Sequence, residues 1–179
     1  MHAWSDGGAG LRRSVASWHD PVMSVTIDRE PPDAPATAEL IADLEVHLAE
    51  LYPAESQHGY SVERLVAEDV HVFVLRSDGV PMGCGGILFV DDATERYGEI
   101  KRMYVRPGSR GSGFGRRILE RLAEHAREHG VTLLRLETGV HQREAIGLYE
   151  SMGFRRGAPF GPYRDDPLSP CYALRLDGP

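Results

Sequence analysis

The sequence predicts an α/β (α+β) fold, a single domain built around a mixed β-sheet. Strand-like apolar runs and apolar residues at helical spacing follow one another along the chain, and glycine- or proline-rich turns separate them. The chain has 179 residues, 41% of them hydrophobic and 26% charged, which suits one globular core. We expect a flexible Gly- and Ser-rich extension over residues 1–22 and the domain over residues 23–179.

The first half of the chain predicts a strand, two helices and a β-hairpin. Pro53 ends the first helix, and Ser61 is a favourable N-cap for the second. Residues 77–79 read Ser-Asp-Gly, a typical hairpin turn. The expected bounds are a strand over 25–27, helices over 40–51 and 61–67, and strands over 70–75 and 80–90.

The second half predicts three more strands and two more helices. Gly130 and Gly153 each follow a helical pattern, as glycines at helix C-termini do. The expected bounds are strands over 99–105, 131–137 and 171–176, with helices over 113–129 and 142–152. Three strands in a meander are thus followed by helix, strand, helix and strand, which is the order of a mixed sheet.

Composition excludes several classes of protein. No apolar run approaches the roughly 20 residues that span a bilayer, and no apolar segment follows Arg12-Arg13 as in a signal peptide. The two cysteines, Cys84 and Cys171, both lie in apolar strand-like segments, which argues against a disulfide framework or a cysteine-based zinc site. We therefore expect a cytoplasmic protein without membrane contact.

Charge is unevenly distributed along the chain. The formal net charge is −7, which argues against general binding to nucleic acid. Residues 101–121 nevertheless carry a net charge of +6, which leaves −13 on the rest of the chain. Such a local basic patch suits a small polyanionic ligand. Lys101 is the single lysine, and no Gly-Lys pair exists, so a Walker-type nucleotide loop is excluded.

A glycine-rich loop stands between a predicted strand and a predicted helix. Residues 110–115 read Arg-Gly-Ser-Gly-Phe-Gly, and Arg116 follows. Glycines allow a ligand to approach the backbone closely, and the unpaired N–H groups at a helix start attract anions. The pattern predicts a pyrophosphate cradle. It is not the Rossmann pattern, since the spacing is G-x-G-x-G and no βαβ unit precedes it. The alternative is a plain glycine-rich turn.

A second motif makes the sequence resemble a known family. Residues 145–154 read Ala-Ile-Gly-Leu-Tyr-Glu-Ser-Met-Gly-Phe. Together with Arg110-x-x-Gly113-x-Gly115, this run is similar to the two signatures of the GNAT superfamily of acetyl-CoA-dependent N-acetyltransferases, in the same order. The resemblance is to small bacterial members. It implies a mixed, mostly antiparallel sheet of six or seven strands flanked by about four helices.

The resemblance also implies which residues bind acetyl-CoA. The glycine-rich loop would hold the pyrophosphate, and the backbone of residues 103–105 would pair with the pantetheine arm. The expected cofactor-binding residues are Met103, Tyr104, Val105, Arg110, Gly111, Ser112, Gly113, Phe114, Gly115, Arg116 and Gln142. At Gln142 the family often has Asn, so this position departs from the pattern.

The resemblance places two catalytic residues. Tyr149 matches the tyrosine that protonates the leaving thiolate, and Glu99 has the spacing of the catalytic glutamate in the histone-acetylating branch. Acetyl transfer to an amine requires a base and an acid of this kind, because an ammonium must lose a proton before it attacks a thioester. Either residue could instead be structural, and Glu137 or His141 could be the base. Strand alternation predicts Glu99, Lys101, Met103 and Val105 on one face.

The loop over residues 160–169 is the candidate acceptor site. In GNAT folds this region often lines the acceptor pocket. We expect substrate contacts from Glu137, Tyr163, Asp165 and Asp166, with the two aspartates attracting a cationic amine. The alternative is a solvated turn.

One further motif is assigned no chemistry. Residues 125–129 read His-Ala-Arg-Glu-His, the His-x-x-Glu-His pattern of some zinc peptidases. We find no position for a third ligand, and histidines near a helix C-terminus suit its dipole. No metal is therefore expected.

The sequence thus predicts transfer of an acetyl group from acetyl-CoA to a primary amine of a small molecule, by direct attack in a ternary complex. Acetylation of a protein N-terminus or lysine is the first alternative. A non-catalytic acyl-CoA sensor is the second. A homodimer is left open, and neither the acceptor nor the acyl-chain preference can be predicted.

Overall fold

The computed structural model describes residues 23–52, 60–93 and 95–176. Seven strands form one sheet in the order β1-β2-β3-β4-β5-β7-β6. The strands are β1 (Val25–Glu30), β2 (His71–Ser77), β3 (Val80–Asp91), β4 (Arg96–Val105), β5 (Leu133–Glu137), β6 (Arg155–Arg156) and β7 (Cys171–Arg175). The helices are α1 (Pro35–Leu51), α2 (Val62–Ala67), α3 (Phe114–Glu128) and α4 (Arg143–Ser151), with a 3₁₀ turn, η2, over Pro107–Ser109. The predicted fold class is confirmed.

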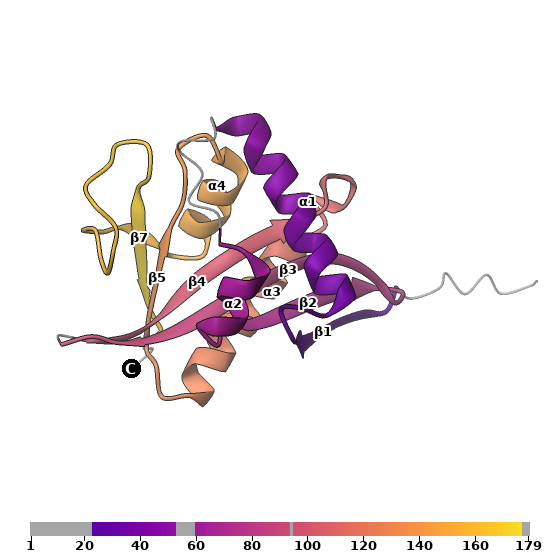
Figure 1. Ribbon diagram of the computed structural model, residues 1–179, viewed down its shortest axis with the longest axis horizontal. Helices are drawn as coiled ribbons and strands as arrows, with labels where there is room; N and C mark the ends of the chain where they lie inside the picture. The colour runs from indigo at the N-terminus through magenta and orange to yellow at the C-terminus, as the bar shows by residue number, and fades with distance from the viewer. Residues whose placement is uncertain (1–22, 53–59, 94, 177–179) are drawn as a thin grey trace, which may run out of the picture.

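Helices cover both faces of the sheet. The strand β2 shows why, because its apolar side chains alternate between two cores. Phe73 and Leu75 pack with α3 and α4, whereas Val72 and Val74 pack with α1 and α2. In Figure 1, α1 and α2 lie in front of the sheet and α3 lies behind it. The sheet is thus buried between two helical layers.

One pair of strands is parallel and short. β4 pairs with β5 only through Gly98–Leu134 and Glu99–Arg135, while all other neighbours in the sheet are antiparallel. Beyond Glu99, no described strand pairs with the edge of β4 that faces β5, and β4 continues to Val105. This opening in the sheet positions the site described below.

A β-bulge reverses the side-chain alternation of β4. Cys84 pairs with Tyr104 and Gly86 with Lys101, so two residues of β4 lie opposite the single Gly85. Arg102 has φ +53° at this point. Met103 and Val105 therefore pack on the α3 face together with Ile100, whereas Lys101 and Tyr104 lie on the α1 face. The prediction that Glu99 and Lys101 share a face with Met103 and Val105 is wrong.

Other expectations differ at element ends and in one short strand. The first helix begins at Pro35, five residues before the predicted start, and the two-residue β6 was not predicted. Ser61 caps α2 as expected, since its Oγ accepts the N–H of Arg64 at 3.3 Å. The extension over residues 1–22 and the helix-ending Pro53 lie outside the described residues. Both cysteines are buried and free. Among the helices described, none is long and apolar enough for a bilayer.

Candidate active site

The glycine-rich loop forms the start of α3. Gly111 and Gly113 have φ near +80°, a conformation that glycine adopts without strain. Gly113 is the N-cap, no side chain caps the helix, and no acid stands in its first turn. The first N–H groups of α3 therefore remain free to bind an anion. Arg110 and Arg116 flank these groups and supply positive charge.

A cavity of about 780 Å³ opens against this loop. It lies between the end of β4, the start of α3 and the helix α4. Its lining residues are His47, Leu51, Met103, Tyr104, Val105, Ser109, Arg110, Gly111, Gly113, Phe114, Gly115, Arg116, His141, Gln142, Arg143, Glu144, Ala145, Leu148, Tyr149 and Ser151. All the expected cofactor-binding residues except Ser112 are among them.

The arginines at this cavity are held in place by hydrogen bonds. Arg110 donates to the carbonyl of Val105 at 3.2 Å and to Glu144 at 3.1 Å. Arg116 donates to Ser151 Oγ at 3.2 Å, which links α3 to α4. The cavity therefore has a cationic wall beside the free helix start, as a pyrophosphate group requires.

A second cavity, of about 310 Å³, adjoins the first. Its lining residues are Leu44, Glu45, Leu48, Tyr52, Tyr60, Ile100, Lys101, Arg102, Met103, Glu137, Thr138, Gly139, Gln142, Tyr149, Tyr163, Asp166, Leu168 and Ser169. Three residues line both cavities, namely Met103, Gln142 and Tyr149. Two ligands could thus meet at the side chain of Tyr149.

Tyr149 is a buried tyrosine between the cavities, with an exposed fraction of 5%. Burial, and secondarily the charge of Glu137, raise the pKa of its hydroxyl well above the usual range. The hydroxyl is therefore protonated at every physiological pH. Glu137 lines the second cavity, and in the described part of the chain no basic side chain forms an ion pair with it. Tyr149 and Glu137 thus both line the second cavity.

Glu99 occupies a different environment. It is 3% exposed and does not line either cavity. Its Oε1 accepts hydrogen bonds from Lys101 Nζ and, at 2.6 Å, from the hydroxyl of Tyr163. Lys101 Nζ also donates to the Tyr163 hydroxyl at 2.9 Å. Lys101 and Tyr163 both line the second cavity. Glu99 therefore contacts two residues of the cavity wall but does not face the cavity itself.

Comparison with known proteins decides the family. The profile of the Acetyltransferase (GNAT) family matches residues 37–154. The chain belongs to this family. A relative named IAA acetyltransferase, from Azospirillum brasilense, is 47% identical over 146 residues, 82% of this chain and 94% of its own. The predicted family and the classification as an N-acetyltransferase are confirmed.

Solved structures of GNAT proteins have the same fold. One from Klebsiella pneumoniae, assigned as an acyl-CoA N-acyltransferase, is 32% identical, has a TM-score of 0.71 and covers 86% of this chain and 98% of its own. An N-acetyltransferase from Thermoplasma acidophilum, in complex with coenzyme A, has a TM-score of 0.68 at 17% identity and covers 86% and 99% of the two chains. At 17% identity, the similarity to the second structure supports the shared fold and nothing about function.

The expected acceptor residues of this GNAT acetyltransferase divide into two groups. Glu137, Tyr163 and Asp166 line the second cavity, whereas Asp165 is exposed and does not. Asp166 Oδ1 accepts the N–H of Leu168 at 2.8 Å, which orders the loop. Their part in acceptor binding stays a prediction.

Sequence reasoning missed the contribution of α1 to both cavities. Tyr52 lines the second cavity, and its hydroxyl accepts the N–H of His141 at 3.0 Å. A Cβ at Gly139 would lie 2.0 Å from that hydroxyl, so any larger residue there would force Tyr52 to move. Arg102 donates to Glu45 of α1. The partners in these contacts are 57 and 89 residues apart in the sequence, so no local sequence pattern predicts the contacts.

Proposed function

We propose that this enzyme transfers an acetyl group from acetyl-CoA to a primary amine of a small molecule by direct attack in a ternary complex. The observation that carries the proposal is the meeting of two cavities at Tyr149. Side-by-side binding of both reactants requires no covalent enzyme intermediate. Membership of the GNAT acetyltransferase family supports acetyl-CoA as the donor.

The larger cavity would hold the coenzyme. The free N–H groups at the start of α3 and the flanking Arg110 and Arg116 would bind the pyrophosphate. The backbone of Met103–Val105 has no β5 partner, so its N–H and C=O groups would pair with the amides of the pantetheine arm. The thioester would then reach the boundary between the cavities, near Tyr149.

The smaller cavity would hold the acceptor. Glu137 would first pair with the substrate ammonium and then take its proton, directly or through water. The amine nitrogen would attack the thioester carbon and form the C–N bond, and an N–H of the exposed β4 edge would stabilise the oxyanion. The C–S bond would break as Tyr149 donates its proton to the departing thiolate, and the second proton of the attacking nitrogen would pass to the Tyr149 phenolate, directly or through water, which restores the tyrosine.

Glu99 has a supporting part in this scheme. Its carboxylate is paired with Lys101 and hydrogen-bonded to Tyr163, so we assign proton removal to Glu137. Glu99 would hold both partners at the wall of the acceptor cavity. A volume of about 310 Å³ suits a small molecule better than a folded protein surface.

A thiol-release assay tests the proposal. The enzyme is incubated with acetyl-CoA and a panel of small primary amines, peptide N-termini and lysine peptides. We expect release of coenzyme A with one or more small amines. Release with peptides alone would favour the protein-acetylating alternative. Tight binding of acetyl-CoA without release for any amine would favour a sensor.

A further inference from the structure

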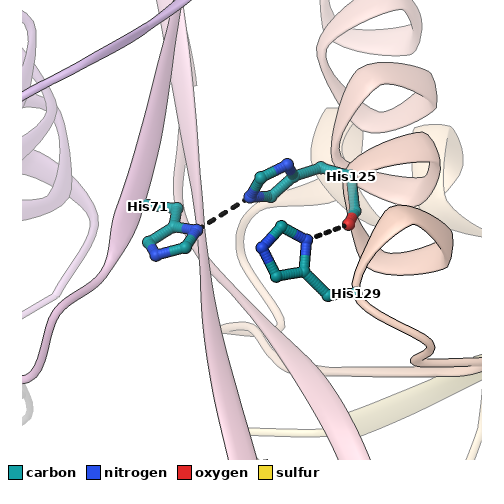
Figure 2. A group of neighbouring side chains, drawn as sticks. All are labelled: His71, His125 and His129. Atoms are coloured by element: carbon teal, nitrogen blue, oxygen red, sulfur yellow. Dashed lines mark hydrogen bonds between the residues drawn. The ribbon is translucent and has the colours of Figure 1, made fainter.

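Three histidines converge at the end of α3 that is opposite the glycine-rich loop. His125 lies in the last turns of α3 and His129 directly follows the helix, so the i,i+4 spacing places them on one face. His71, the first residue of β2, approaches from the sheet (Figure 2). One ring nitrogen from each residue lies within 4.8 Å of the other two. The sequence expectation that no third ligand is available is wrong.

The outward contacts of the three rings, two hydrogen bonds and one longer approach to a carboxylate, indicate which nitrogens face one another. His125 Nδ1 lies 3.2 Å from Glu128 Oε2, and His129 Nδ1 lies 2.8 Å from the carbonyl oxygen of His125. His71 Nε2 lies 3.8 Å from a carboxylate oxygen of Asp69. The inner nitrogens are therefore Nε2 of His125 and His129 and Nδ1 of His71. Metal-binding histidines show this arrangement, with the outer nitrogen bonded to a carboxylate or a carbonyl.

We propose that His71, His125 and His129 form a binding site for a divalent transition-metal ion of the class that imidazole prefers, with Zn²⁺ as the reference ion. Bonds of about 2.0–2.1 Å at tetrahedral angles separate ligand nitrogens by about 3.3 Å. His71 Nδ1 and His125 Nε2 are 2.7 Å apart and share a hydrogen bond, so they must separate by a few tenths of an ångström. The proton of this hydrogen bond then moves to His71 Nε2, which faces Asp69.

The surroundings of the histidines suit such an ion. His71 and His125 are buried, whereas His129 is exposed and leaves a fourth position open to water. The Phe73 ring packs edge-on against His125, and the Phe89 ring stacks on His129.

This site is separate from the acetyl-transfer site. Phe114 lines the coenzyme cavity, and His125 follows it by eleven residues of the same helix, or about 17 Å at 1.5 Å per residue. Glu128 is paired with Arg121, so it is not free to act as the base of a zinc peptidase. The ion would connect β2 to the C-terminal end of α3 and stabilise the fold.

Zinc titration of the untagged, chelator-treated full chain tests the site. We expect one Zn²⁺ per chain by calorimetry, and a Tm rise of about 5–10 °C at a 100-fold excess over Kd. Co²⁺ should give the visible absorption bands of a tetrahedral site. H71Q and H129Q should lose both signals. H141Q, which changes an exposed histidine elsewhere, should keep them. Circular dichroism checks that each variant is folded.

Three outcomes would overturn the proposal. The first is absence of stoichiometric binding to the wild-type chain. The second is binding that survives in folded H71Q and H129Q. The third is binding that H141Q abolishes, which would place the ion elsewhere. Because His129 is exposed, H129Q keeps the test valid even where replacement of the buried His71 impairs folding.

Discussion

In the proposed mechanism, Tyr149 is the residue on which the chemistry depends most directly. The Y149F variant keeps the buried ring and removes only the hydroxyl, so the acetyl-CoA affinity should stay within a few-fold. Turnover should fall by about 10²- to 10⁴-fold, because the leaving thiolate loses its proton donor. Steady-state kinetics and calorimetry measure both quantities. Full activity in Y149F would show that Tyr149 is a packing residue.

The pKa of Tyr149 has a consequence for the pH profile. Burial raises this pKa, so the protonated, donating form persists above the ordinary tyrosine value of about 10. The wild-type rate should therefore show no decline between pH 8 and about 10 that comes from this residue. A decline that Y149F removes would contradict the assignment.

The two glutamates should respond differently to amide substitution. E137Q keeps the shape of the side chain but cannot take a proton, so kcat/KM should fall by about 10²- to 10⁴-fold and recover partly at high pH, where free amine is abundant. E99Q removes the partner of Lys101 and should lower activity without changing the shape of the pH profile. Measuring kcat/KM from pH 6 to 10 for both variants tests this difference. If E99Q instead showed the large loss that recovers at high pH, and E137Q did not, Glu99 would be the base.

At the scale of elements, the start of α3 should determine coenzyme affinity. Gly113 has φ +79°, and a Cβ there would meet no atom within 4 Å. Alanine would thus strain the backbone without a clash, at about 1–2 kcal/mol, and the Kd for coenzyme A should rise about tenfold. G147A is the matched control, because Gly147 lies in α4 in open space and outside the cavities. It should leave the Kd unchanged. Equal affinities of wild type and G113A for coenzyme A would show that the loop does not take part in coenzyme binding.

Local patterns predicted the elements and the glycine-rich loop, because helices, turns and helix starts depend on residues close in sequence. The same patterns could not predict the bulge at Arg102, which arises from pairing with a strand about 18 residues away and reverses the faces of β4. They also missed His71, which is 54 residues from His125. Tyr52 and the wall formed by α1 were missed for the same reason. Long-range packing decides these positions.

At the scale of the whole molecule, the divergence of β4 and β5 creates the site. The sheet opens after Glu99, and the loop before α3 and the helix α4 close the coenzyme side. Residues of α1 and the loop over 160–169 close the acceptor side. The two cavities meet at Tyr149, a residue of α4. In the proposed mechanism, one sheet would therefore bring the donor and the acceptor together.

The measurement that tests direct transfer most plainly is an initial-rate study that varies acetyl-CoA and a reactive amine together. Direct transfer in a ternary complex predicts intersecting double-reciprocal lines and no release of coenzyme A before the amine is added. It also predicts no acetylated enzyme by intact mass. Parallel lines, with a burst of coenzyme A and an acetyl adduct on the enzyme, would contradict the account.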